Sequence, residues 1–176
     1  ADDPSRGLGF SRRPVLDVGR DGAFDDNGLI LGDVLRHEGQ VLMYYVGFQH
    51  VAKAKFLAFS GLATSKDEGR TFQRYSEVPI LDRSTDSLDI RAIQSILFEN
   101  GLFRVWYAVG NSWEWIGGKA FPCYHIWSME SKSPFNLNES GRLCVDVEGD
   151  EYRIGRPRVY RAEGVYHMFY TRGTKS

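Results

Sequence analysis

The apolar and polar positions of this chain repeat with a period slightly above 60 residues. Each repeat contains an apolar strand, a two-residue turn that ends in Gly, and a second apolar strand that ends in an aromatic residue followed by Tyr. The turn glycines are Gly39, Gly101 and Gly164, so they lie 62 (101 − 39) and 63 (164 − 101) residues apart. The three segments are 34–45, 96–107 and 159–170. This pattern predicts a β-hairpin that recurs three times.

The repeat extends on both sides of the hairpin. A short apolar stretch that ends in Asp precedes each copy, and further strand-like segments separated by turn residues follow the first two copies. The preceding stretches are 14–17, 79–82 and 143–146, and the following segments are 59–63 with 65–72 and 124–129 with 131–135. Each complete unit therefore supplies four strands. The sequence predicts an all-β fold, a β-propeller of four-stranded antiparallel blades, with about two and a half blades present.

The blade boundaries follow from the repeats. We expect blade 1 at about 18–78, blade 2 at about 79–146 and the start of blade 3 at about 147–176, while 8–17 would form the outer strand of the closing blade. The third repeat stops after its second strand, and propellers close with about four to eight blades. We therefore expect the remaining blades to come from a longer chain, of which this is a fragment, or from self-association through open strand edges.

Composition adds little to the choice of partner. The formal net charge is −1 and the sequence pI is about 6.5, which favours neither nucleic acid nor an anionic membrane as a ligand. No apolar run approaches the roughly 20 residues of a membrane span. The compartment stays open between cytoplasmic and secreted. Cys123 and Cys144 fall on neighbouring predicted strands, where we expect two small buried apolar residues rather than a facing pair, and their disulfide state stays open.

Several segments resemble the five-bladed β-propeller glycoside hydrolases, the arabinanase, invertase and levansucrase superfamily of families 43, 32 and 68. The segments that carry the resemblance are 21–28, 61–67, 79–83 and 151–159. The resemblance covers nearly the whole chain and corresponds to roughly the first half of such a propeller. It implies five blades around an axial funnel, and cleavage of a glycosidic bond by carboxylates in that funnel.

Three carboxylates occupy similar positions in the three repeats. Asp26 lies 13 residues before Gly39, Glu151 lies 13 before Gly164, and Asp89 lies 12 before Gly101. Glycoside cleavage needs one carboxylic acid to protonate the departing oxygen and one carboxylate to attack or to activate water. The resembling family uses Asp, Asp and Glu from its first three blades in that order. The resemblance therefore implies Asp26 as base or nucleophile, Asp89 as orienting residue and Glu151 as general acid.

Alternatives to this catalytic set remain. Asp25 or Asp33 could take the place of Asp26, and carboxylates before a blade commonly cap turns or face water. In the resembling family the carboxylates lie closer to the hairpin, where this chain carries apolar and small residues. Those residues are Ile30 or Leu31, Ser95 and Gly155. Either the loops before the blades are longer here, or the catalytic set is missing and the propeller binds sugar without cleaving it.

Other side chains are candidates for substrate binding. Arg91 and Arg156 flank the proposed acids and could hold hydroxyls, phosphate or carboxylate, or could pair only with Asp89 and Glu151. Between the second and third strands of repeat two, residues 113–118 should form a loop over the funnel. Its tryptophans offer faces for sugar rings or form a small core of their own. The complete set of substrate-binding candidates is Arg91, Arg156, Trp113, Trp115, His50 and His125.

Metal ions and cofactors have weak support in the sequence. His50 and His125 lack zinc-ligand spacing, so no metal residue is assigned. The oxygen-rich loop 21–27 lacks the full spacing of a calcium loop, and a Ca²⁺ there or on the axis is only a minor expectation. Residues 65–72 fit the Asp box of sialidases, in which Asp67 accepts turn N–H groups and Gly69 allows positive φ. We expect this box to stabilise an outer hairpin, away from the axis.

The sequence thus predicts a carbohydrate ligand and a glycosidase that uses paired carboxylates. A non-catalytic carbohydrate-binding or assembly propeller is the alternative. A glycoside phosphorylase, in which phosphate replaces water, is a further alternative. The sugar, the linkage and the stereochemical outcome do not follow from the sequence.

Overall fold

A computed structural model describes residues 3, 5, 7, 9, 11–137 and 140–176. Ten strands and no helix are assigned within these residues. The strands are β1 (Leu29–His37), β2 (Gln40–His50), β3 (Phe56–Ser65), β4 (Gln73–Arg74), β5 (Ile90–Glu99), β6 (Leu102–Ile116), β7 (Lys119–Ser131), β8 (Arg142–Val145), β9 (Glu151–Ala162) and β10 (Val165–Thr174). The all-β prediction is confirmed, and the described part contains no helix that could span a membrane.

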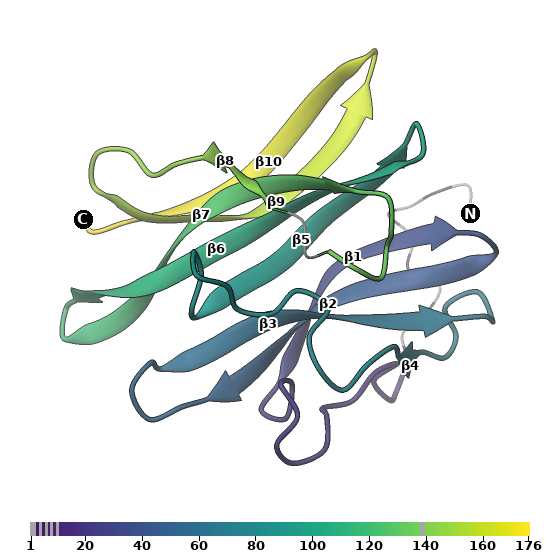
Figure 1. Ribbon diagram of the computed structural model, residues 1–176, viewed down its shortest axis with the longest axis horizontal. Helices are drawn as coiled ribbons and strands as arrows, with labels where there is room; N and C mark the ends of the chain where they lie inside the picture. The colour runs from purple at the N-terminus through teal and green to yellow at the C-terminus, as the bar shows by residue number, and fades with distance from the viewer. Residues whose placement is uncertain (1–2, 4, 6, 8, 10, 138–139) are drawn as a thin grey trace.

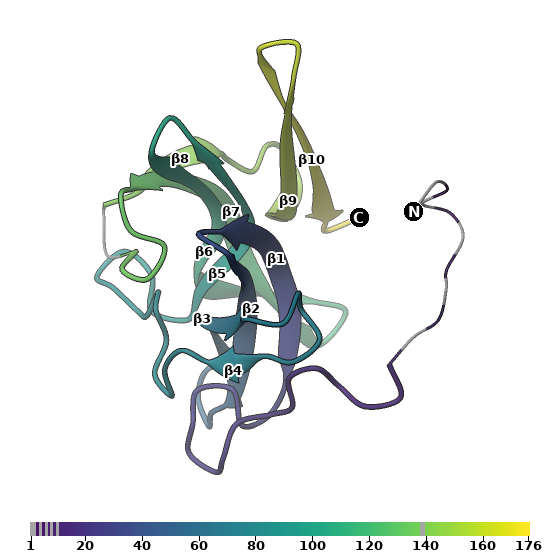
Figure 2. The same ribbon diagram turned by 90° about the vertical axis from the view of Figure 1, so that its right-hand side faces the viewer.

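The strands form two complete antiparallel blades and the start of a third. Strands β1 to β4 make blade 1, β5 to β8 make blade 2, and β9 with β10 begins blade 3. Short parallel contacts join β3 to β5 and β7 to β9, which gives the order β1-β2-β3-β5-β6-β7-β9-β10. Figure 1 shows blade 1 low in the view, β5 to β7 across the middle, and the β9–β10 hairpin at the top. Turned by 90°, Figure 2 shows this hairpin standing apart at one end of the molecule.

The expected blade boundaries stay predictions. Close to the boundary expected at about residue 78, Ile80 and Leu81 bond to Ser60 of β3. The segment 8–17 lies partly outside the described residues, and its described part, 11–17, pairs with none of the ten strands. Its pairing with a closing blade stays a prediction.

The three predicted hairpin turns share one conformation. The two turn residues have φ of 47° and 75° at Glu38-Gly39, 52° and 77° at Asn100-Gly101, and 50° and 81° at Glu163-Gly164. Positive φ at both positions is the type I′ turn, whose twist matches that of the strands it joins. All three turns point to the same side of the molecule, on the right in Figure 1, so the inner strands β1, β5 and β9 begin at the opposite side.

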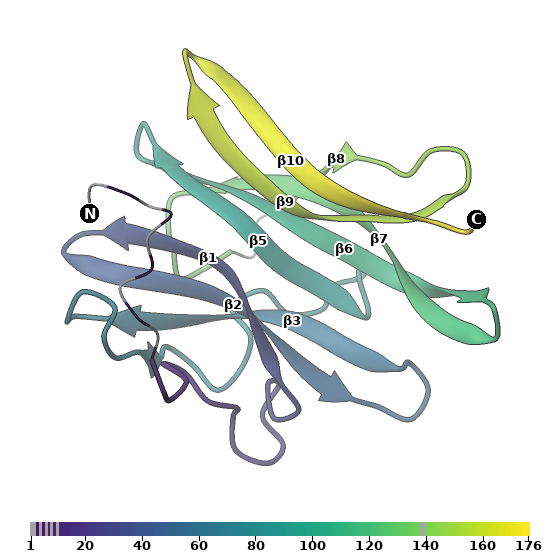
Figure 3. The ribbon, with the colours of Figure 1, turned by 180° about the vertical axis from the view of Figure 1, so that it is seen from behind.

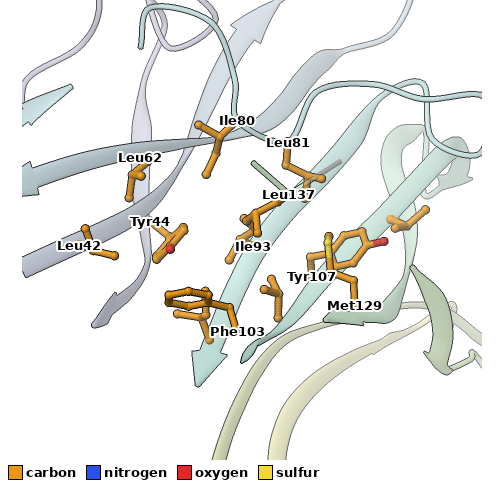
Figure 4. Packing of buried hydrophobic residues seen from close by; sticks show 13 residues of the cluster. Leu42, Tyr44, Leu62, Ile80, Leu81, Ile93, Phe103, Tyr107, Met129 and Leu137 are labelled. Carbon is orange, nitrogen blue, oxygen red and sulfur yellow. The ribbon is translucent and has the colours of Figure 1, made fainter. Parts of the chain in front are cut away.

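The main core lies between blades 1 and 2. Apolar side chains from both blades interdigitate there, and Leu137 from the loop after β7 is fully buried among them (Figure 4). The cluster comprises Leu42, Tyr44, Leu62, Ile80, Leu81, Ile93, Ile96, Phe103, Val105, Tyr107, Val109, Met129 and Leu137. Burial of this many large side chains is the main force that holds neighbouring blades face to face.

Blade 3 is covered less completely. A smaller cluster, formed by Trp106, Ile126, Ile154 and Val159, joins it to blade 2. Strand β10 is the last in the strand order, and Figure 3 shows it from behind. Several of its large apolar side chains are exposed, including Phe169 at 66%. Such an uncovered face is consistent with the expected further blades, whose source stays a prediction.

Both cysteines are free thiols, and the expectation that both are buried is wrong. Cys123 on β7 is half-buried and Cys144 on β8 is exposed. Ile126 pairs with Val145, and Trp127 pairs with Leu143, so Cys123 lies outside the short paired stretch and has no facing residue on β8. The β8 strand is too short to bring the two thiols opposite each other.

One hydrogen bond repeats between the inner strands of neighbouring blades. The Asp33 carboxylate of β1 accepts the Ile96 N–H of β5 at 2.9 Å, and the Ser95 hydroxyl of β5 accepts the Val159 N–H of β9 at 3.0 Å. Asp33 and Ser95 each lie six residues before the turn glycine of their own blade. The residues whose N–H groups they accept, Ile96 and Val159, each lie five residues before the turn glycine of the next blade. Asp33 also pairs with Arg158, which occupies the corresponding position in blade 3.

Removing either acceptor should destabilise the protein, because a buried N–H would lose its partner. We expect Asp33→Ala and Ser95→Ala each to lower the free energy of unfolding by about 1–3 kcal/mol. The half-exposed Arg158 contributes a surface ion pair, so Arg158→Ala should cost about 1 kcal/mol or less. Denaturant unfolding of the three variants measures the difference. Equal losses in Asp33→Ala and Arg158→Ala would show that the ion pair, and not the N–H bond, joins the blades.

The Asp box forms the expected turn between β3 and β4. The Asp67 carboxylate accepts the Thr71 hydroxyl at 2.6 Å and the Thr71 and Arg70 N–H groups at 2.9 and 3.1 Å. Ser65 donates its hydroxyl to Asp67 and accepts the N–H of Gly69, whose φ is 85°. The hydrogen bonds from Thr71, first its hydroxyl and then its N–H, hold the pKa of Asp67 well below its usual value.

This lowered pKa predicts how the turn responds to acid. The folded-state pKa of Asp67 lies below the unfolded value, so its contribution is present above about pH 4 and is lost as the pH falls further. We expect Asp67→Ala to lower the thermal midpoint at pH 7, with a smaller difference from wild type at about pH 2.5. Thermal unfolding at the two values measures this. A difference that does not shrink in acid would contradict a role for the ionised carboxylate.

Candidate functional site

The three inner strands share an irregularity near their middle. Gly32 has no partner in the β1–β2 pairing, whose register shifts there, and Gln94 likewise has none in the β5–β6 pairing. In blade 3 the β9–β10 register passes over Arg156 and Pro157. Gly32, Gln94 and Pro157 each lie seven residues before their turn glycine, so the bulge belongs to the repeat. A bulge re-aims the local side chains and bends the strand, and here it does so at the same level in all three blades.

The bulges meet around one cavity of about 240 Å³, lined by Ile30, Leu31, Gly32, Gln94, Arg156, Pro157 and Arg158. Arg156 has φ of 54°, the left-handed region, and its N–H donates to the Gln94 side-chain oxygen at 2.8 Å. A Cβ on Gly32 would lie 2.3 Å from the Ile93 carbonyl oxygen. Glycine is therefore needed for β1 to approach β5 this closely.

A second hollow of about 250 Å³ adjoins the first and shares Ile30, Gln94 and Arg156 with it. We call the two together the axial cavity. The second part is mainly apolar, with arginine and tyrosine heads among its lining. Its lining residues are Ile30, Val46, Phe48, Phe56, Ala58, Ile90, Ala92, Gln94, Ala108, Pro122, Tyr124, Arg153 and Arg156. Burial raises the pKa of the Tyr124 phenol, so its hydroxyl stays protonated and can donate a hydrogen bond at neutral pH.

The predicted carboxylates lie outside this lining, and each is held within its own part of the chain. Asp26 accepts the Gly22 N–H at 2.9 Å and so closes the turn before β1. Asp89 accepts the indole N–H of Trp113 at 3.0 Å. Glu151 pairs with Arg172 at 3.0 Å and accepts the Glu148 N–H at 2.9 Å. Within the described part of the chain, no hydrogen bond or ion pair joins any two of the three, and their convergence stays a prediction.

The two alternatives to Asp26 have other partners. The Asp25 side chain is fully buried and binds Arg74, whose guanidinium reaches one carboxylate oxygen at 2.7 Å. Arg74 also donates to the Asp17 carbonyl, so this pair ties the segment before β1 to β4. Asp33 is engaged in the contact between blades described above. Removing one partner of such a buried ion pair would leave the other charge buried without compensation.

The two candidate arginines have different surroundings. The buried Arg91 donates to the Asp82 carbonyl at 2.8 Å and lies over the Tyr107 ring, away from the axial lining. Arg156 lines the axial cavity, and no ion pair to its guanidinium is present among the residues described. The alternative pairings of Arg91 with Asp89 and of Arg156 with Glu151 do not form.

The tryptophan segment is a hairpin and not the expected loop. Strand β6 continues to Ile116, β7 starts at Lys119, and Gly117 and Gly118 close the turn with positive φ. Trp113 and Trp115 line a separate open cleft of about 450 Å³ on this hairpin. The two strands lengthen past an irregularity between Val109 and Ser112, which the repeat pattern does not reveal.

Comparisons with solved structures identify the fold. The chain aligns with the β-fructofuranosidase BmSUC1 of Bombyx mori, a family 32 glycoside hydrolase, at a TM-score of 0.60 and 19% identity, covering 79% of this chain and 28% of that one. A BmSUC1 variant in complex with sucrose aligns at a TM-score of 0.59. The structure of a BT0996 complex aligns at 0.63 and 19% identity, covering 87% of this chain and 50% of that one. The chain has the β-propeller fold found in glycoside hydrolases.

Sequence comparisons point to relatives of greater length. Two Mycobacterium tuberculosis proteins, named Uncharacterized protein Rv1502 and Uncharacterized protein MT1551, are each 28% identical to this propeller over 172 residues. The alignments cover 96% of the chain and 56% of each relative, so the chain spans little more than half their length. No protein-family model matches the sequence.

Neither candidate histidine lines the axial cavity. The backbone N–H of His50 donates to the Asn27 side-chain oxygen at 2.7 Å, and His125 contacts Asp146 at 2.6 Å through Nδ1. Over the described ranges, no group of three or more His, Cys, Asp or Glu residues is arranged to hold a metal ion.

Several polar side chains that line the axial cavity were not selected in the sequence analysis. Gln94, Tyr124, Arg153 and Arg158 all contribute to its lining. The repeat itself holds a usable signal, because the position seven residues before each turn glycine forms the bulge. Tyr124 and Arg153 have no such signal, since they reach the cavity through the parallel pairing of β7 with β9.

Proposed function

We propose that this propeller binds carbohydrate in its axial cavity, and that binding does not depend on Asp26, Asp89 or Glu151. The observation that carries the proposal is the lining of the cavity. It combines apolar walls with amide, phenol and guanidinium groups, and no Asp or Glu is among the described residues that line it. Glycosidic cleavage requires two carboxyl groups that face the substrate, so this lining favours binding.

The lining suits a sugar ring in two ways. The faces of Phe48 and Phe56 offer apolar surface on which the C–H groups of a ring can rest, and their mutual edge-to-face contact, with centroids 5.5 Å apart, fixes both rings. Tyr124, Gln94 and Arg156 supply hydrogen-bonding groups for hydroxyls. Small ligand sites commonly combine such apolar walls with a few placed polar groups.

The position of Arg156 supports its role as the central polar contact. A non-glycine residue at positive φ is costly, and the Gln94 side chain holds the backbone of Arg156 in this conformation. The Bombyx mori protein, a relative in fold, has a variant in complex with sucrose. The proposal extends carbohydrate binding, but no particular sugar, to this chain.

Two variants test the axial site. We expect Tyr124→Phe and Arg156→Ala each to weaken sugar binding about tenfold or more, because each removes a hydrogen-bonding group and leaves the apolar walls in place. Arg70→Ala, which alters an exposed arginine outside the lining, is the matched control and should bind like wild type. A glycan array of neutral mono- to tetrasaccharides, including sucrose, identifies ligands, and titration calorimetry measures affinities. Absence of any binding on the array, or equal affinity in all variants, would refute the proposal.

Cleavage of a glycosidic bond is the second candidate function. One observation favours it: Asp89 and Glu151 stand at the starts of the inner strands β5 and β9, and Asp26 lies shortly before β1. Quasi-symmetry would place all three at the same side of the blades. Phosphorolysis is a variant of this candidate, in which inorganic phosphate held by Arg156 replaces the attacking water.

Isosteric amides separate catalysis from positioning. If cleavage depends on these carboxylates, Asp89→Asn and Glu151→Gln should each lower kcat by about 10²-fold or more with little change in KM. If Asp89 only positions Trp113, Asp89→Asn should behave like wild type, because its amide oxygen can still accept the indole N–H, whereas Asp89→Ala should not. Release of reducing sugar from oligosaccharides, with and without inorganic phosphate, measures both cases.

A further inference from the structure

A separate cleft lies on the extended hairpin of blade 2. The cleft of about 450 Å³ is formed by the β2–β3 loop and the β6–β7 hairpin, and its lining is Lys53, Lys55, Trp113, Trp115, Gly118, Lys119 and Ala120. Figure 1 shows the ends of these two hairpins on the same side of the molecule, at the left, opposite the three type I′ turns. We call it the lysine–tryptophan cleft.

The charge of this cleft is unusual for the chain. Lys53, Lys55 and Lys119 are all exposed, and none of them forms an ion pair with any residue that the structure describes. No carboxylate belongs to the lining. Glu114 lies between the two tryptophans, but strand alternation puts its side chain on the other face, where Lys175 pairs with it at 3.1 Å. Three uncompensated cations therefore gather on a protein whose formal net charge is −1.

The two indoles form a platform beside these cations. Trp113 is fixed by its N–H bond to Asp89 at 3.0 Å and by an edge-on contact with Phe56, with ring centroids 5.0 Å apart. Trp115 lies two residues further along β6, on the same face, and is 71% exposed. An exposed indole next to a fixed one offers an apolar surface for a flat ligand face.

The cleft and the axial cavity lie back to back. Phe56 lines the axial cavity, and its ring contacts Trp113, which lines the cleft. Pro122, also in the axial lining, is the strand partner of Trp113. The two sites are therefore separated by a wall that Phe56 and Trp113 form.

We propose that the lysine–tryptophan cleft binds an acidic sugar, a ring that carries a carboxylate or sulfate group. The ring would lie on Trp113 and Trp115, and its anionic group would contact Lys53, Lys55 and Lys119. This inference rests on the proposed carbohydrate function, since that function favours a sugar over other anions. The ammonium groups act as point charges and do not by themselves select carboxylate over sulfate.

The test compares charged and uncharged forms of one probe. Trigalacturonate and its fully methyl-esterified form differ only in the charge at the carboxyl groups, and a sulfated heparin tetrasaccharide covers the second anion. We expect wild type to bind at least one acidic probe about tenfold or more tightly than the methyl ester, with an affinity that falls as NaCl rises from about 50 to about 500 mM. Titration calorimetry and tryptophan fluorescence report the binding.

Matched variants locate the contact. Lys53→Gln/Lys55→Gln should weaken acidic-probe binding about tenfold, and Trp115→Ala should weaken binding of charged and uncharged probes alike. The control, Lys66→Gln/Lys132→Gln, removes the same charge from other turns and should leave affinity unchanged. Equal loss in both lysine pairs would reduce the effect to net charge and overturn the proposal. So would tighter binding of a phosphatidylserine vesicle or a dT12 oligonucleotide through Lys53 and Lys55.

The two sites fail in distinguishable ways. If neutral sugars do not bind, but an acidic probe binds through Lys53 and Lys55, the axial proposal fails and the cleft stands. If neutral sugars bind and Tyr124→Phe weakens them, while no acidic probe exceeds its uncharged form, the cleft proposal fails and the axial site stands. Thermal unfolding of each variant separates a lost contact from a lost fold.

Discussion

The bond from one inner strand to the backbone of the next sets the geometry of this propeller. The acceptor side chain lies six residues before the turn glycine of its own blade, and the N–H that it accepts lies five residues before the turn glycine of the next blade. Asp33 accepts the N–H of Ile96 in this way, and Ser95 accepts the N–H of Val159. These buried bonds fix the height at which each blade meets its neighbour. The bulges lie one residue before the acceptors, so the same bonds bring Gly32, Gln94 and Pro157 to one level. The axial cavity follows from that alignment.

Features controlled by local chemistry could be predicted from the sequence. The type I′ turns follow from Glu or Asn before Gly between two apolar strands, and the Asp box follows from the spacing of Ser65, Asp67, Gly69 and Thr71. The period then gives the blades, because a hairpin that recurs with further strands cannot bury its faces without neighbours. In each case a few adjacent residues determine the conformation, and no distant contact is needed.

The site could be predicted only in part, because long-range pairing forms it. Asp33 and Arg158 are 125 residues apart (158 − 33), and nothing local to either residue indicates their contact. Tyr124 reaches the cavity through a single parallel bridge to Arg153. The β6–β7 pairing shifts after Val109 and then continues from Ser112 to Ile116, so the tryptophan segment forms a hairpin and not the expected loop. Counting back from the turn glycines locates carboxylates in the sequence, but a bulge changes where a side chain points.

The repeat is kept where the blades are joined and is lost where ligands would bind. The acceptor position holds Asp33, then Ser95, but in blade 3 it holds Arg158, which turns to Asp33 and adds a cation beside the cavity. The residue just before the shared bulge position is Leu31, Ile93 and Arg156 in the three blades. Three equal blades would surround the axis with three equal side chains and could favour no orientation of an asymmetric sugar. The polar side chains of the lining come from blades 2 and 3, and only blade 3 brings arginines, whereas blade 1 contributes apolar side chains and Gly32. A sugar ring, with one face richer in C–H groups and hydroxyls at its edge, matches that division.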